Sequence, residues 1–128
     1  MFRFLELAEL EELHIDSLRA YGGADGVRDS GLIESALASA KNTAFYAGGD
    51  VFDVAATYAF HIAEAQAFLD GNKRTAIASA LGFLALNHPM RKPAGATLDA
   101  LYAAMIAIAR HELDKAGLAA LLRRLFGG

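Results

Sequence analysis

Apolar residues recur at helical spacing in six segments of the chain, and short glycine-rich or polar breaks separate these segments. Apolar positions three and four residues apart share one face of a helix. The long apolar–polar alternation that indicates strands is missing, and valine occurs only at three positions. The pattern therefore predicts an all-α fold. The predicted helices span about residues 5–20, 29–42, 50–68, 72–86, 97–110 and 114–126.

Polar residues with short side chains stand where four of these helices are expected to begin. Asp29 or Ser30, Asp50, Thr97 and Asp114 each carry an oxygen that can accept a hydrogen bond from an unpaired N–H group in a first helical turn. We therefore expect these residues to cap the second, third, fifth and sixth helices.

The third and fourth predicted helices are apolar or small on nearly every side, which is typical of helices in the middle of a bundle. They are joined by the polar stretch QAFLDGNKRTA, residues 66–76, which we expect at the turn of a central antiparallel hairpin. Residues 1–128 are predicted to form one compact domain of about six helices around this hairpin. Small residues that would allow close approach are Ala55, Ala56, Ala59, Ala63 and Ala65 on the third helix and Ala76, Ala78, Ala80 and Gly82 on the fourth.

Composition narrows the class of protein. At 128 residues and 55% hydrophobic content the chain can bury a core, and it is too apolar for disorder. No apolar run reaches the roughly 18 residues of a membrane span, and the charged N-terminal segment is unlike a secretory signal. The absence of cysteine and a net charge of -3 favour a cytoplasmic protein without a broad nucleic-acid surface. We expect neither membrane nor direct nucleic-acid binding.

The stretch DGNKRT combines the groups of an anion site. A helix that begins at Asn72 has unpaired N–H groups and a positive dipole end, to which Lys73 and Arg74 add full charges. Phosphate suits such a site, and Gly71 lets the backbone come close to a ligand. Asp70 would repel phosphate unless Mg²⁺ bridged the two. These residues predict a magnesium–nucleotide site, in which Asn72 bonds a phosphate or holds the loop; the plainer alternative is a capped helix with solvated charges.

The same residues resemble a known family. FLDGNKRTA is similar to the signature of the Fic/Doc superfamily, whose Doc-like members read H-x-F-x-D-x-N-K-R-T-A. The similarity extends to YGGADGVRDSGLIESAL, to the helices on both sides of the motif, and to LLRRLF near the C-terminus. It covers about residues 14–126 and implies an all-α fold.

The resemblance also implies a function. Doc-like toxins transfer the terminal phosphate of ATP to a hydroxyl of elongation factor Tu and so stop translation. They are usually encoded beside a Phd-type antitoxin, whose disordered tail folds as a helix into an apolar groove. By the family pattern, Asp70 would hold Mg²⁺ and Phe68 would anchor the loop in the core. The ATP phosphates would be held by Gly71, Asn72, Lys73, Arg74 and Thr75.

Gln66 departs from the family pattern, because it stands where Doc-like proteins have the motif histidine. In the family this histidine takes the proton from the attacking hydroxyl, for which the pKa of imidazole is suitable. A glutamine amide can hydrogen-bond a hydroxyl but cannot deprotonate it. Losing a general base costs on the order of 10²–10⁴ in rate, so we predict a catalytically impaired chain.

None of the four histidines is expected to replace the missing base. His61 lies about 140° around the same helix from Gln66, and His88 ends the next helix, about 24 Å from its start. His14 and His111 belong to segments that the sequence does not place near the motif. Gln66 is therefore either a deliberate replacement in a toxic protein or a natural variant with lost or changed activity. The otherwise intact signature favours the first explanation.

Two other functions and one local question stay open. Relatives with G-N-G-R transfer AMP instead of phosphate, but Lys73 makes this sequence G-N-K-R. A non-catalytic module that binds nucleotide or antitoxin is the third hypothesis, and Gln66 supports it. Arg28 and Asp29 could contact substrate or pin the loop in which they lie, and we favour pinning.

Overall fold

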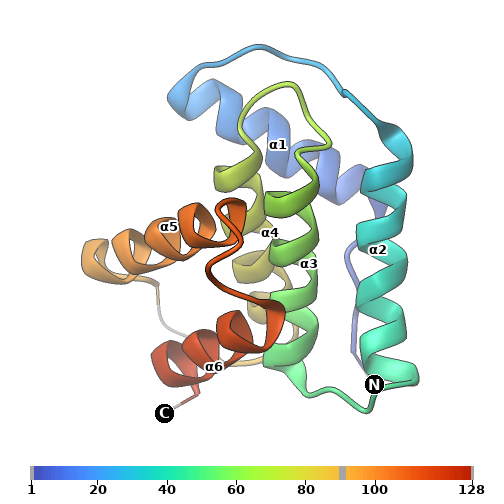
Figure 1. Ribbon diagram of the computed structural model, residues 1–128, viewed down its shortest axis with the longest axis vertical. Coiled ribbons are helices and arrows are strands. Elements are labelled where there is room, and N and C mark those ends of the chain that lie inside the picture. The colour runs from blue at the N-terminus through green and yellow to red at the C-terminus, as the bar shows by residue number, and fades with distance from the viewer. Residues whose placement is uncertain (1, 90–91, 128) are drawn as a thin grey trace.

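The computed structural model describes residues 2–89 and 92–127, and six helices account for most of them (Figure 1). Within these residues there is no strand, only an isolated antiparallel bridge between Val27 and Phe68. The predicted all-α fold is confirmed, and none of the described helices has the length and apolar character to cross a membrane. The helices are α1 Leu7–Tyr21, α2 Ser30–Phe45, α3 Val51–Ala65, α4 Asn72–Asn87, α5 Gly95–Ala109 and α6 Lys115–Phe126.

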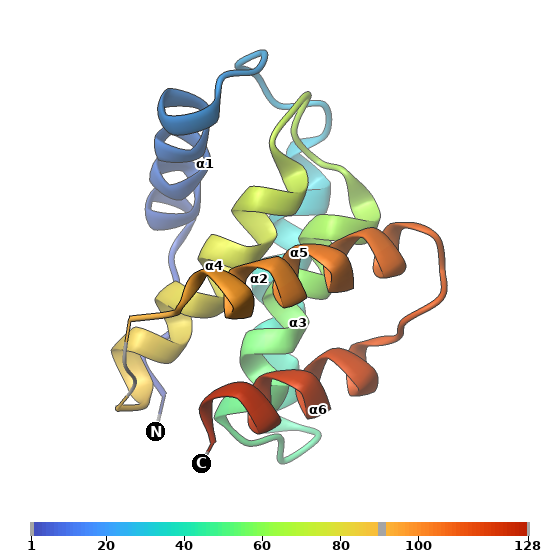
Figure 2. The same cartoon turned by 90° about the vertical axis from the view of Figure 1, so that its left-hand side faces the viewer.

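Helices α3 and α4 form the predicted central hairpin, with α2, α5 and α6 packed around α3 and α1 packed on α4 (Figures 1 and 2). Tyr58 on α3 and Phe83 on α4 are fully buried and contact each other, with their ring centroids 5.4 Å apart. Most of the small residues lie in this core as expected, where they let the two backbones approach. Ala55, Ala56, Ala59, Ala63, Ala76 and Ala80 are buried, and Ala65, Ala78 and Gly82 are half-buried.

Three of the expected helix caps are confirmed, because Asp29, Asp50 and Asp114 accept hydrogen bonds from backbone N–H groups at the starts of α2, α3 and α6. Thr97 was wrongly expected to cap the fifth helix. Helix α5 begins earlier, at Gly95, after Ala94, and has no side-chain cap. Its first N–H groups can do without one because this helix end is exposed, where water can bond them.

The third helix ends at Ala65, earlier than the predicted Phe68. Gln66 follows it in the left-handed conformation, with φ 52° and ψ 50°, and this turns the chain out of the helix. Glycine usually occupies such a position because a side chain makes it unfavourable. The sequence has no glycine there, so it gives no signal that the helix stops.

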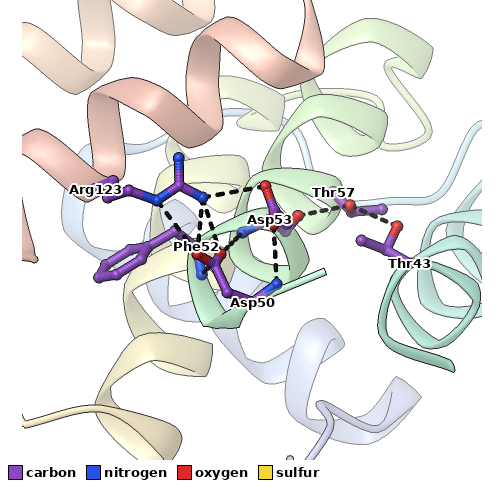
Figure 3. Close-up of polar contacts among 6 residues, drawn as sticks. All are labelled: Thr43, Asp50, Phe52, Asp53, Thr57 and Arg123. Carbon is purple, nitrogen blue, oxygen red and sulfur yellow. Dashed lines mark hydrogen bonds and ion pairs between the residues drawn. The ribbon is translucent and has the colours of Figure 1, made fainter. Parts of the chain in front are cut away.

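Arg123 of α6 binds Asp50 at the N-terminal end of α3 (Figure 3). Asp50 accepts hydrogen bonds from the N–H groups of Phe52 and Asp53, at 3.0 and 2.9 Å, and its two carboxylate oxygens accept further bonds from Arg123. Burial by itself would raise the pKa of Asp50. The hydrogen bonds from Asp53 and Arg123 outweigh this effect and lower the pKa below its ordinary value of 3.8.

We expect Asp50→Ala to lower the free energy of unfolding by about 1–2 kcal/mol, because it removes the cap of α3. Asp50→Asn is the matched control: it keeps one acceptor oxygen for the cap and loses the charge and the second oxygen that bind Arg123, so it should cost less. Urea unfolding at neutral pH measures both values. Equal losses in the two variants would show that the hydrogen-bonded cap contributes nothing.

The difference between the parent chain and Asp50→Asn should also depend on pH. Because the folded state lowers the pKa of Asp50, its charge stabilises the fold fully above the unfolded value near 3.8. This contribution is lost as the pH falls through the lower folded value, where the protonated carboxyl no longer pairs with Arg123. An unchanged difference in strong acid would contradict this account.

Candidate functional site

The loop between α3 and α4 carries the motif residues at one end of the central hairpin (Figure 1). It begins at Gln66 and ends at Gly71, which has φ 75° and precedes the first turn of α4. Phe68, at 1% exposure, points into the core, as the family pattern implies. The loop therefore has a buried apolar centre and leaves its polar residues at the surface.

Asn72 closes this loop with its side-chain amide. Its Oδ1 accepts a hydrogen bond from the Phe68 N–H, and its Nδ2 donates one to the Phe68 carbonyl, each at 3.0 Å. The amide thus pairs with the backbone of Phe68 as a neighbouring strand would. These bonds favour the loop-holding role of Asn72, while its contact with phosphate stays a prediction.

The glycine-rich segment between α1 and α2 pairs with the same loop. The N–H groups of Arg28 and Asp29 donate to the Ala67 carbonyl at 2.7 and 3.1 Å, and the Leu69 N–H donates to the Gly26 carbonyl at 3.1 Å. The Asp29 side chain caps α2 at the same point. Arg28 and Asp29 therefore pin the loop through their backbone, which confirms the interpretation that the sequence favoured.

The carboxylate of Asp70 is exposed but held in place. One oxygen accepts from the Gly71 N–H at 2.9 Å and the other from the Ala24 N–H at 3.3 Å. These hydrogen bonds, first from Gly71 and then from Ala24, lower the pKa of Asp70, and the positive charge of Arg74 acts in the same direction. Asp70 is therefore an ionised carboxylate whose remaining lone pairs face solvent.

Such a carboxylate fits a hard divalent cation. Within the described residues no group of three or more acidic, histidine or cysteine side chains could hold a metal ion. Mg²⁺ is commonly bound through one or two carboxylates, with water and substrate phosphates completing its shell. Asp70 fits this second type of site, in which the nucleotide itself supplies ligands.

A cavity of about 260 Å³ opens beside the loop and brings most of the predicted site residues together. Thr75 is the exception, because it is fully buried and does not line the cavity. Tyr102 of α5 was not predicted; it lines the cavity from a segment that no local motif connects to the loop. The lining residues are Ala63, Gln66, Leu69, Asp70, Gly71, Asn72, Lys73, Arg74 and Tyr102.

None of the four histidines lines this cavity, as the sequence led us to expect. Gln66 does line it and is exposed. That it takes the place of the family's base stays a prediction. His61, on α3, is half-buried and does not line the cavity; burial lowers its pKa, and the charge of Lys115 adds to this effect. No histidine therefore lies in the cavity beside Gln66.

His14, however, is much closer to the loop than the sequence indicated. It is buried on α1, its ring stacks on Phe68 with centroids 3.8 Å apart, and its Nε2 lies 2.8 Å from the Asp70 carbonyl oxygen. The sequence reasoning missed this contact because 56 residues separate the two partners. Nothing in the local pattern of α1 marks His14 as different from a core residue.

A second, larger cavity of about 470 Å³ lies between α1, α4 and α5, and we call it the groove. Arg74 and Tyr102 line both the groove and the loop cavity. The Arg74 guanidinium lies over the exposed ring of Tyr21, 4.6 Å from its centroid, in a cation–π contact. The groove is lined by Leu13, Asp16, Ser17, Ala20, Tyr21, Arg74, Ile77, Ala78, Leu81, Leu98, Asp99 and Tyr102.

Comparisons with known proteins agree with these features. Residues 4–84 match the Fic/DOC family, a range that includes the whole loop. The chain is 34% identical to "Protein kinase doc" of Escherichia phage P1 over 128 residues, covering 98% of this chain and 97% of that protein. It is 42% identical to "Toxin Doc" of Mycolicibacterium smegmatis over 72 residues, covering 53% of this chain and 54% of that protein.

Proposed function

Because the chain belongs to the Fic/DOC family, we propose that it is a Doc-like toxin with protein kinase chemistry. It would transfer the terminal phosphate of ATP to a threonine or serine hydroxyl of elongation factor Tu and so stop translation in the cytoplasm. The observation that supports this most is the loop cavity, where a held carboxylate, two cationic side chains and the start of a helix meet. This is the donor set that a magnesium–nucleotide needs.

Each group in the cavity has a role in this proposal. The first N–H groups of α4 and the side chains of Lys73 and Arg74 bind and orient the ATP phosphates. Asp70 would hold Mg²⁺, and the metal would supply positive charge to neutralise the phosphates. Asn72 holds the loop around them. The acceptor hydroxyl would enter beside Gln66.

At that point the chain lacks a base. The Gln66 amide can orient the hydroxyl through a hydrogen bond, but its oxygen is too weakly basic to take the proton. Phosphoryl transfer depends mainly on positioning and charge, so nucleotide binding and a slow residual reaction are expected to persist. We therefore propose a Doc-like enzyme impaired at its base.

ATP labelled at either the terminal or the innermost phosphorus tests the reaction type. The Gln66→His variant is incubated with elongation factor Tu, Mg²⁺ and each labelled ATP in turn. Transfer of the terminal label alone supports the kinase. Transfer of the innermost label would instead show AMP transfer, and no transfer of either label with intact antitoxin binding would support a non-catalytic module.

We also propose that the groove between α1, α4 and α5 receives the helical tail of a Phd-type antitoxin. Its walls are largely apolar, and carboxylates of α1 and α5 stand on its rim, Asp16 and Asp99. An adjoining hollow shares Leu13 and Asp16 with it and adds Glu9 and Glu12. An amphipathic helix with apolar anchors and basic residues along one flank would complement this surface.

Filling the groove should weaken antitoxin binding. Ala78→Gln places a longer side chain on the half-buried groove wall of α4, and we expect at least a roughly 10-fold higher Kd for the antitoxin tail. The matched control is Ala38→Gln, at an exposed position of α2 outside the groove. Titration with a synthetic tail peptide measures both. Equal affinity in the two variants would place the antitoxin elsewhere.

A further inference from the structure

His14 makes two contacts with the motif loop and does not line the cavity. Its ring lies nearly parallel to Phe68, at 15°, and its Nε2 is 2.8 Å from the Asp70 carbonyl oxygen. At 3% exposure His14 is buried, and a buried polar ring atom is normally retained with a hydrogen-bond partner. A carbonyl oxygen only accepts, so Nε2 must carry the proton of this bond.

This hydrogen bond fixes the orientation of the peptide between Asp70 and Gly71. In a planar trans peptide the C=O and the following N–H point in opposite directions. Holding the Asp70 carbonyl toward α1 therefore turns the Gly71 N–H away from α1. That N–H donates to the Asp70 carboxylate at 2.9 Å. The hydrogen bond from α1 thus sets the direction of the N–H group that binds the carboxylate, because both groups belong to one rigid peptide.

Without the hydrogen bond from His14, the Asp70–Gly71 peptide could rotate more easily about the backbone bonds on either side of it. Gly71 has φ 75° and no side chain, so it opposes few rotations of the preceding peptide. The His14 ring is close to Gly71: a Cβ atom added at Gly71 would be 3.7 Å from His14 Cδ2 and 3.8 Å from Nε2. A turned peptide would take the Gly71 N–H away from the carboxylate.

We propose that His14 is a positioning residue, which holds the Asp70–Gly71 peptide so that the Asp70 carboxylate stays in place for the metal side of a nucleotide. This inference rests on the proposed nucleotide-binding function. His14 is not a candidate base, because it does not line the cavity and its Nε2–H is already donated to Asp70.

Two variants separate the hydrogen bond from the packing. His14→Gln can place an amide N–H close to the position of Nε2, whereas His14→Met has no donor, and both lose the aromatic stacking on Phe68. ATP affinity is measured by titration with Mg²⁺ and again with a chelator. We expect the methionine variant to raise the Kd with Mg²⁺ about 10-fold and the Kd without metal much less, since it loses one hydrogen bond. The glutamine variant should stay close to the parent with and without metal. Equal effects of the two variants with Mg²⁺ would overturn the proposal.

A second measurement needs neither nucleotide nor a variant. Nitrogen-15 NMR of the parent chain reports the tautomer of each histidine ring, and we expect the proton of His14 on Nε2. A proton on Nδ1 alone would overturn the proposal, because the bond to the Asp70 carbonyl could not then form. If the parent binds no Mg-ATP, the proposed function fails. The His14 tautomer in the parent chain then still tests the hydrogen bond to the Asp70 carbonyl. The Gly71 amide resonance, compared between the glutamine and methionine variants, tests whether that bond holds the peptide.

Discussion

Replacing Gln66 with histidine is expected to raise the rate of phosphate transfer to elongation factor Tu by about 10²–10⁴-fold. Imidazole would stand in the cavity beside Asp70 and Lys73, where it could take the proton of the acceptor hydroxyl. The backbone should accept the change, because Gln66 is exposed and has a positive φ. Histidine is among the residues that occur most often in this left-handed conformation.

The control for this prediction is Gln66→Asn, since asparagine also tolerates the left-handed backbone but supplies no base. The intact mass of elongation factor Tu is followed over time with Mg²⁺ and ATP for all three chains. We expect only the histidine variant to add one phosphate rapidly. A parent chain that reacts as fast as the histidine variant would show that Gln66 does not impair the enzyme.

Replacing Phe68 with alanine is expected to lower the free energy of unfolding by about 3–5 kcal/mol, the range typical for truncating a buried aromatic side chain. Phe68 is 1% exposed and stacks on His14, while its N–H and C=O are bonded by Asn72. The cavity left behind cannot easily collapse, because backbone bonds to Ala67 and Leu69 hold the loop on both sides.

The neighbouring Leu69→Ala serves as the control, because the Leu69 side chain is 50% exposed and its loss should cost much less. Urea unfolding of both variants, followed by circular dichroism, gives the two free energies. If the two variants lose the same stability, Phe68 does not anchor the loop.

The chain pattern predicted the architecture because the information for it is local. Helical spacing marks the six segments, and the caps Asp29, Asp50 and Asp114 can be identified from residue type alone. The two errors also have local causes. Exposed N–H groups let α5 start without Thr97, and Gln66 stops α3 in a conformation that usually requires glycine.

The site was only partly predictable, because some of its residues come from segments that are far apart in the chain. Asp70 and Lys73 are neighbours in the chain, so one motif places them in one cavity. Thr75 belongs to the same motif, but the helical turn that it occupies carries its side chain into the core. His14 and Tyr102 reach the loop through tertiary packing of α1 and α5, which no local spacing records.

The hydrogen bonds that hold Asp70 in place connect segments that are far apart in the chain. The central hairpin joins helices that follow each other in the chain, so little loop entropy is lost when it forms. The bonds to Asp70 from Ala24 and His14 close loops of 46 and 56 residues. Closing such long loops costs more entropy, and regions held by exposed backbone hydrogen bonds, such as that from Ala24, open more easily than the core. We therefore expect mild heating to melt the site first, while the hairpin beneath it stays helical.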